Sequence, residues 1–161
     1  MDISTNDHRV VAVVDDEPMV LQSIKNFLNL ETDYEVLTYT SPKSAIDGLR
    51  EQPVDVIISD YLMPEINGIE FLLQMKEMQP QATRVLLTGY ADKENAIKAI
   101  NDVGLYQYIE KPWENEDLRL VIRNAIEKRM LLKRLSEKVA ELDRASAALK
   151  GVYSDLMKAF K

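Results

Sequence analysis

Val10-Val11-Ala12-Val13-Val14-Asp15-Asp16 decides the fold of this chain, because five apolar residues in a row end in two acids. A short continuous apolar run is typical of a strand that is buried on both faces, as in a parallel sheet. Three later runs also end in polar residues: Val54–Ser59 before Asp60, Val85–Leu87 before Thr88, and Tyr106–Ile109 shortly before Lys111. Parallel strands end at one edge of a sheet, and open α/β sheets bind their ligands at that edge. We therefore expect these polar side chains to form one site.

Helical patterns separate the apolar runs. Repeated strand–helix units predict an α/β fold, a doubly wound parallel sheet with helices on both faces. Ser41 is a suitable N-cap and Pro42 a suitable first residue for one of these helices. The expected elements are an edge strand at Tyr34–Thr40 and helices at Pro18–Leu30, from Pro42, at Gly68–Met78 (Ile69, Leu72, Leu73 and Met75 inward) and at Asp92–Val103 (Ala96, Ile97 and Ile100 inward).

Composition excludes several classes of protein. The chain has 161 residues, of which 46% are hydrophobic, enough for a buried core. A net charge of -7 argues against direct nucleic-acid binding, which needs clustered Lys and Arg. The chain has no cysteine, which excludes disulfides and thiolate metal sites. Residues 1–7 are polar, unlike a signal peptide, and no apolar stretch reaches the ~20 residues that span a bilayer. We expect a cytoplasmic protein that does not enter the membrane.

The C-terminal part of the sequence has a different character. From Glu114 to Lys150 it contains neither Gly nor Pro, and a helix of that length extends about 55 Å. Gly151 is expected to end or kink this helix. The sequence predicts a globular α/β domain at 1–128, which carries the site at the strand ends, and a helical coiled-coil linker or dimerisation segment at 129–161. Its seam alternates in steps of three and four: Leu132, Leu135, Val139, Leu142, Ser146, Leu149, Tyr153 and Leu156.

Two observations qualify the coiled-coil prediction. Arg129, Leu132 and Leu135 are spaced three and three, which breaks the heptad phase where the helix should leave the globular domain. The alternative is a solvated helix whose apolar residues pack on their own domain, and the length of the seam disfavours it.

The acids at the strand ends predict a site for Mg²⁺, a cation that prefers oxygen ligands. Asp16 and Asp60 can each supply one oxygen, and Asp15 can hold a coordinating water. Clustered carboxylates repel one another unless a cation joins them. Taken alone, the pair Asp15 and Asp16 would be read as a turn or helix cap before Pro18. A third acid at the end of another strand favours the metal.

The same edge predicts phosphoryl chemistry. Asp60 is central among the strands and is the natural nucleophile, since a carboxylate that attacks a phosphoryl group gives an acyl phosphate. Lys111 supplies a point charge for one phosphate oxygen, and Thr88 offers a hydroxyl to another. Tyr108 lies near the end of the last strand, where an aromatic is most often part of the core. The sharper hypothesis is an aromatic switch that follows Thr88.

These residues together resemble the receiver domain of bacterial two-component response regulators, over roughly residues 8 to 128. The match rests on Asp15-Asp16, Asp60-Tyr61-Leu62-Met63-Pro64 with Gly68, Thr88, Tyr108 and Lys111-Pro112. The resemblance implies a flavodoxin-like (βα)5 sheet in the order 2-1-3-4-5. It implies that Asp60 accepts phosphate from a histidine kinase or phosphotransfer protein. The domain would then be a signalling protein rather than an enzyme, with only self-catalysed phosphotransfer and dephosphorylation.

The resemblance also implies roles for single residues. It implies Mg²⁺ on Asp16, Asp60 and the backbone carbonyl of Leu62, with Asp15 acting through water. Lys111 and Thr88 would contact the phosphate, Tyr108 would be the switch, and Lys111–Pro112 would be a cis peptide. The chain departs from the pattern at Gly89, where the family often has alanine.

Thr88-Gly89-Tyr90-Ala91-Asp92 and Lys111-Pro112-Trp113 look like a subset of these regulators, in which the last helix runs on into a coiled-coil linker. A catalytic output domain often follows in that subset, and none fits within 129–161. We expect an N-terminal piece of a longer regulator with a downstream output domain, or else a stand-alone receiver with a dimerising tail. In both cases the tail is expected to make a parallel homodimer.

Two other classes of protein share parts of this pattern. An aspartate-nucleophile phosphohydrolase resembles the chain in its α/β core, but that family uses Asp-x-Asp after the first strand, and here the acids are adjacent. A flavin-binding electron carrier would need a phosphate-cradling loop after the first strand. Asp15-Asp16-Glu17-Pro18 would instead repel the flavin phosphate.

Overall fold

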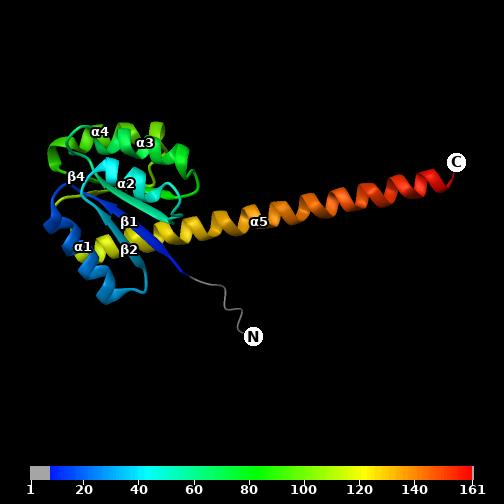
Figure 1. The fold of residues 1–161 in the computed structure, drawn as a ribbon, viewed down its shortest axis with the longest axis horizontal. Helices are drawn as coiled ribbons and strands as arrows, with labels where there is room; N and C mark the ends of the chain where they lie inside the picture. The colour runs from blue at the N-terminus through cyan, green and yellow to red at the C-terminus, as the bar shows by residue number, and fades with distance from the viewer. Residues whose placement is uncertain (1–7, 161) are drawn as a thin grey trace. The chain divides into compact units, whose positions relative to one another are not determined.

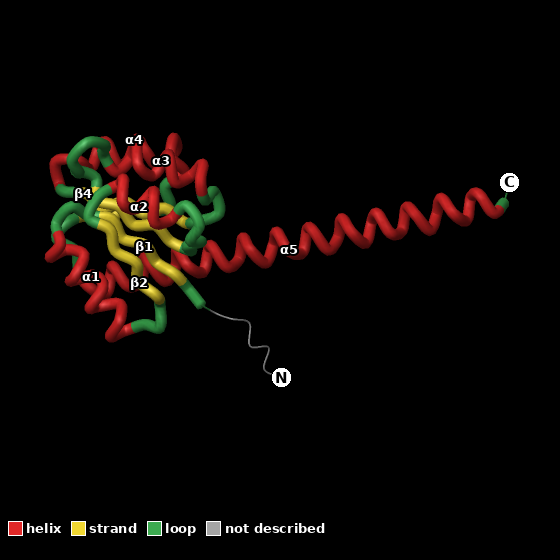
Figure 2. Tube along the Cα trace, in the orientation of Figure 1, coloured by secondary structure: helices red, strands yellow, loops and turns green. Residues whose placement is uncertain are grey.

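The computed structural model describes residues 8–160 and consists of alternating strands and helices followed by one long helix (Figures 1 and 2). Residues 1–7, on which the argument against a signal peptide rests, lie outside the described residues, as does Lys161. The elements are β1 Val10–Val14, α1 Pro18–Glu31, β2 Glu35–Tyr39, α2 Pro42–Leu49, β3 Val56–Asp60, α3 Gly68–Met78, β4 Thr83–Thr88, the 3-10 turn Tyr90–Asp92, α4 Lys93–Ala99, a π-helical turn Ile100–Gly104, β5 Gln107–Glu110 and α5 Asn115–Ala159.

The five strands form one parallel sheet in the order β2-β1-β3-β4-β5, which confirms the predicted fold. β2 is an edge strand, as its alternating pattern predicted. Helices α2, α3 and α4 lie on one face of the sheet and α1 on the other (Figures 1 and 2). Ser41 caps α2 as expected, because its side chain accepts the backbone N–H of Ser44.

The core lies on both faces of the central strands. β1, β3 and β4 are buried at every residue, because helices cover both of their faces. Ala12, Ile57 and Leu86 pack with side chains of α2, α3 and α4 in one cluster. Burial of both faces explains why these three strands read as continuous apolar runs in the sequence.

Two inward assignments were wrong. In α3 the buried positions are Gly68, Phe71, Leu72 and Met75, whereas Leu73 is 40% exposed. In α4 the predicted inward residue Ile97 is 49% exposed, and Ala96 and Ala99 face the core. A helix advances about 100° per residue, so the neighbour of a core residue turns toward solvent even when it is apolar.

The helix predicted at Asp92–Val103 is also shorter than expected. α4 ends at Ala99, and the chain continues as a π-helical turn to Gly104, which has a φ of 65°. The buried guanidinium of Arg84 donates to the carbonyls of Val103 and Gly104, at 3.2 and 3.3 Å, and holds this turn against β4. Burial lowers the pKa of Arg84. The guanidinium donates to backbone carbonyls, whose partial negative charge stabilises its positive charge.

A buried hydrogen bond and a longer, half-buried ion pair anchor the first part of α5. The hydroxyl of Thr83, the first residue of β4, donates to the carbonyl of Ala125 at 3.0 Å. One turn further on, Nε of Arg129 lies 3.9 Å from Oδ1 of Asp55, whose Oδ2 accepts the backbone N–H of Val10. These contacts fix which face of α5 turns toward the sheet as far as Arg129.

The described chain divides into a unit that ends at Arg129 and a helical unit from Met130 onward. α5 continues without interruption to Ala159, so the helix does not end at Gly151, which was one of the two outcomes expected there. A single glycine costs a helix about 1 kcal/mol relative to alanine, less than the surrounding Ala and Leu residues offset. No helix within residues 8–160 combines the length and apolar character that crossing a bilayer requires.

Candidate functional site

Three carboxylates meet at the carboxyl ends of β1 and β3. Asp15 and Asp16 follow β1 directly, and Asp60 is the last residue of β3, which pairs with β1 in parallel. One oxygen from each of the three lies within 4.8 Å of the others. Asp15 and Asp60 are buried and Asp16 is exposed, so the cluster opens to solvent on one side. Three converging carboxylate oxygens with solvent access fit the ligand preference of Mg²⁺.

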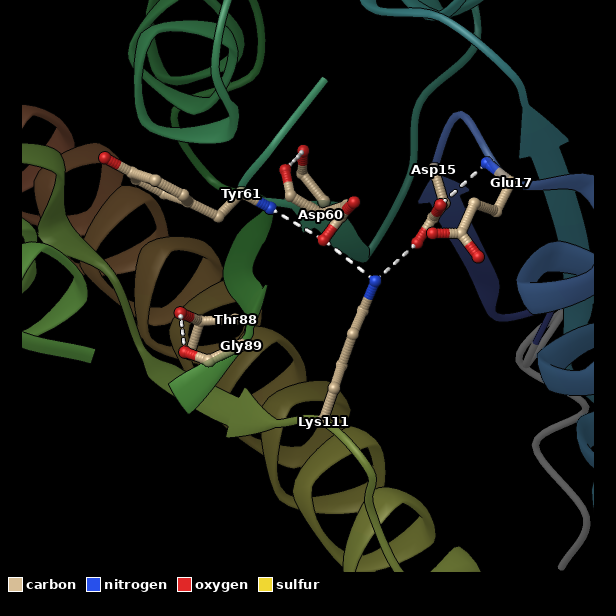
Figure 3. Close-up of polar contacts among 8 residues, drawn as sticks. Asp15, Glu17, Asp60, Tyr61, Thr88, Gly89 and Lys111 are labelled. Carbon is tan, nitrogen blue, oxygen red and sulfur yellow. Dashed lines mark hydrogen bonds and ion pairs between the residues drawn. The ribbon is translucent and has the colours of Figure 1, made fainter. Parts of the chain in front are cut away.

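Lys111, which directly follows the edge strand β5, brings a cation into this acidic cluster. Its Nζ lies 2.9 Å from Oδ1 of Asp60 and 3.2 Å from Oδ2 of Asp15 (Figure 3). The backbone N–H of Lys111 donates to the carbonyl of Thr88 at 2.8 Å, which ties the end of β5 to the end of β4. The Lys111–Pro112 peptide bond is cis, as the resemblance implied.

Backbone amides orient the two buried carboxylates. Oδ1 of Asp60 accepts the N–H of Tyr61 at 3.0 Å in addition to the contact with Lys111, and Oδ1 of Asp15 accepts the N–H of Glu17 at 2.9 Å (Figure 3). Within residues 8–160, Oδ2 of Asp60 has no hydrogen-bond partner. This oxygen therefore keeps its lone pairs for attack on an electrophile.

The charges of the site are coupled. Burial raises the pKa of Asp60, and the hydrogen bond from Lys111 offsets only part of that effect, while the charge of Asp15 adds to it. For Lys111, burial acts to lower the pKa, but the hydrogen bond that Lys111 donates to Asp60 and the charges of Asp15 and Asp60 raise it above its usual value. Lys111 consequently stays positively charged at neutral pH and is the fixed countercharge of the cluster.

The other predicted site residues lie at the same edge without entering the acidic cluster. Thr88 ends β4 and is buried, and its hydroxyl donates to the carbonyl of Gly89 at 3.1 Å (Figure 3). Leu62 lies in the loop after β3, with its side chain 62% exposed.

Tyr108 occupies β5 opposite Leu86, half-buried against the core cluster. It also lines a cavity of about 460 Å³ together with Trp113 and Leu120.

Gly68 has a structural role that sequence reasoning missed. Its N–H donates to the carbonyl of Tyr61 at 2.7 Å, and a Cβ at this position would lie 2.1 Å from the carbonyl oxygen of Asp60. Only glycine lets the start of α3 approach the backbone of Asp60 so closely. The signals in the sequence were a glycine at the start of a predicted helix, eight residues after Asp60, and its place in the receiver-domain motif, and neither predicted this contact with the backbone of Asp60.

Comparison with known proteins gives consistent matches. Residues 11–123 match the family model of the response regulator receiver domain. The hydrogenase transcriptional regulatory protein HoxA of Cupriavidus necator is 39% identical over 117 residues, which are 73% of this chain and 24% of HoxA. The transcriptional regulatory protein KdpE of Mycobacterium tuberculosis is 28% identical over 142 residues, 88% of this chain and 62% of KdpE.

Among solved structures, a response regulator receiver domain protein from Clostridium thermocellum superposes with a TM-score of 0.72 at 36% identity. The match covers 77% of this chain and 98% of that protein. The chain spans about a quarter of the length of the HoxA proteins it matches, 24% in C. necator and 29% in Bradyrhizobium diazoefficiens.

Proposed function

This chain belongs to the response regulator receiver family, and we propose that Asp60 is its phosphoacceptor. The chain is a phosphoacceptor signalling domain. The family match and the similar regulators do not favour the alternative function, an aspartate-nucleophile phosphohydrolase. The observation that supports Asp60 is its contact with Lys111 at 2.9 Å inside a cluster of three carboxylates. Among these acids, only Asp60 combines burial, a central strand and an oxygen that accepts no hydrogen bond.

In the proposed reaction, Oδ2 of Asp60 attacks the phosphorus of a donor. An O–P bond forms, the bond from phosphorus to the donor's leaving group breaks, and an acyl phosphate results. Lys111 exchanges its contact with Asp60 for one with a phosphoryl oxygen. Mg²⁺ held by Asp15, Asp16 and Asp60, with the carbonyl of Leu62, would supply positive charge that offsets repulsion between the carboxylate and the phosphoryl oxygens.

The response to phosphate involves Thr88 and Tyr108 in this proposal. The Thr88 hydroxyl donates to Gly89 in the present structure, and it can rotate toward a phosphoryl oxygen, since a hydroxyl turns about one bond. Tyr108 then moves within the cavity that it shares with Trp113. The peptide contact between Thr88 and Lys111 supports this coupling, because it joins the ends of the two strands concerned.

The proposed phosphodonor is a histidine kinase or a phosphotransfer protein. Exposed apolar side chains near the carboxylates support docking of such a protein: Met19, in the first turn of α1, is 84% exposed, and Leu62 is 62% exposed. We propose further that the tail forms a homodimer and passes the signal to an output domain. The greater length of HoxA and KdpE supports that second part.

The test is phosphorylation of the full chain with acetyl phosphate and Mg²⁺, followed by intact mass. The wild type should gain one phosphoryl group, and Asp60→Asn should gain none. Asp47→Asn is the matched control, since Asp47 lies on α2 and its ion pair with Arg50, the residue after that helix, is exposed. Phosphate uptake by Asp60→Asn at the wild-type rate would show that another residue is the nucleophile.

A further inference from the structure

The tail of α5 presents an unpartnered apolar stripe. With Leu132 at position a of a heptad, every d position through Leu156 is leucine: Leu135, Leu142, Leu149 and Leu156. These four side chains are between 53% and 71% exposed in the single chain. The a positions are Leu132, Val139, Ser146, Tyr153 and Phe160, so the stripe continues for four heptads. A seam of this length with leucine at d is typical of a two-stranded coiled coil.

We infer that this stripe binds a second copy of the chain in parallel and in register, with Ser146 and the pairs Lys138–Asp143 and Val152–Met157 specifying the alignment. This inference deepens the proposed homodimer and rests on it. The residues that flank the seam at positions e and g favour this parallel, in-register alignment. In a parallel dimer, each g residue faces the e residue five positions later in the other chain.

The flanking residues complement each other in parallel order. Lys138 at g faces the partner's Asp143 at e, so opposite charges meet on both sides of the dimer. Val152 at g faces the partner's Met157 at e, so two apolar side chains extend the core beside Tyr153. Among the described residues 8–160, Lys138 pairs with Glu141 alone, and this ion pair is highly exposed. Such a pair contributes little, which leaves the lysine available to a partner.

Antiparallel order fits these residues less well. There g faces g, and the g residues are Leu131, Lys138, Ala145, Val152 and Ala159, none of which is acidic. Lys138 would therefore meet an apolar residue or another lysine, although Asp143 would meet the partner's Lys150. Ser146 would pack against leucine at d, whereas in parallel order its hydroxyl meets the partner's Ser146 and can form a hydrogen bond. A single polar residue at an a position sets register in this way.

The heptad assignment also explains why Gly151 is tolerated. Gly151 falls at position f, the outermost position of the heptad, and a Cβ built there would meet nothing within 4 Å in the described chain apart from its chain neighbours and the backbone of its own part of the helix. The seam therefore loses no contact at this glycine.

Disulfide crosslinking tests the inference, because the wild type has no cysteine. Ser146→Cys in the full chain should form a covalent dimer under mild oxidation. Ser154→Cys, at the outward b position about two turns further along the same helix, should crosslink at least about tenfold more slowly. A dimer by light scattering in which Ser146→Cys crosslinks no faster than Ser154→Cys would overturn the parallel in-register arrangement. A monomeric wild type at micromolar concentration would overturn the pairing altogether.

Charge exchange provides a second, independent test. Lys138→Glu should raise the dimer dissociation constant about tenfold at low salt, because two attractive pairs become repulsive. Adding Asp143→Lys should restore the wild-type value in a parallel dimer. In an antiparallel dimer Asp143→Lys would meet the partner's Lys150 and weaken binding further, which would refute the inference. Phosphorylation measured on the same variants separates the two proposals, since Asp60 should accept phosphate in all of them.

Discussion

Replacing Lys111 with glutamine should make the stability of the receiver unit depend strongly on Mg²⁺. Nζ of Lys111 lies 2.9 Å from Oδ1 of Asp60 and 3.2 Å from Oδ2 of Asp15, and both carboxylates are buried. Glutamine retains most of the side-chain volume but removes the charge. In chelator, the two buried acids would then lose their fixed countercharge.

The expected loss can be scaled from known buried ion pairs. Removing one partner of a fully buried pair destabilises by roughly 3–5 kcal/mol. The Lys111 side chain is 24% exposed, and the neighbouring Asp16 is open to solvent, so water relaxes part of the remaining charge. We therefore expect Lys111→Gln to lower the free energy of unfolding by about 2 kcal/mol in chelator at neutral pH. Mg²⁺ should reduce the deficit, because it binds the folded state and returns positive charge to the same carboxylates.

Urea unfolding followed by circular dichroism measures this effect, at one fixed protein concentration, with chelator and with Mg²⁺. Lys93→Gln is the matched control, because Lys93 makes an exposed 3.9 Å ion pair with Glu110. That substitution should change the free energy of unfolding by less than about 0.5 kcal/mol in both buffers. The reasoning is refuted if Lys111→Gln matches Lys93→Gln in chelator, or if its deficit is unchanged by Mg²⁺.

Four further substitutions test other parts of the site and tail. Asp16→Ala should weaken Mg²⁺ binding measured by calorimetry, and an unchanged affinity would exclude Asp16 as a direct ligand. Gly68→Ala should lower the free energy of unfolding by at least about 2 kcal/mol, since its Cβ would lie 2.1 Å from the carbonyl oxygen of Asp60. By contrast, Gly151→Ala should stabilise the tail helix by about 0.5–1 kcal/mol, and equal melting shifts for both alanines would contradict this reasoning. Asp60→Asn should raise the melting temperature in chelator at neutral pH: burial raises the pKa of Asp60 in the folded state, so its ionised form disfavours folding above that pKa. The gain in melting temperature should shrink as the pH falls below the ordinary pKa range of aspartate, because Asp60 is then protonated in both the folded and the unfolded state. A gain that does not depend on pH would contradict the raised pKa of Asp60.

The strands and the convergence of the site could be predicted from the sequence for a simple physical reason. Strands buried on both faces need continuous apolar residues, and parallel strands end at the same edge. Asp15 and Asp60 therefore meet although 45 residues separate them. The expected strands overlap all five observed strands, and the two sets differ only in where individual strands begin or end.

What the sequence could not predict depends on contacts between distant segments. The choice between Leu72 and Leu73 as core residues depends on where the sheet lies, because the helix is apolar at both positions. The π-helical turn after α4 depends on the buried guanidinium of Arg84, which comes from β4. The need for glycine at Gly68 arises from the path of another backbone segment. None of these leaves a local pattern.

The anchoring of α5 by Thr83 and Arg129 sets a rule for grafting this receiver onto other outputs. A fusion joint placed before Ala125 would remove the carbonyl that accepts the buried Thr83 hydroxyl, and a joint before Arg129 would leave Asp55 without its ion pair. The transplanted segment should therefore extend through Arg129. Beyond Arg129, an insertion or deletion of seven residues, one heptad, keeps the leucine stripe on the same face of the helix. Changes of three or four residues turn everything downstream by about 50° in opposite directions, which offers a graded way to tune a chimeric regulator.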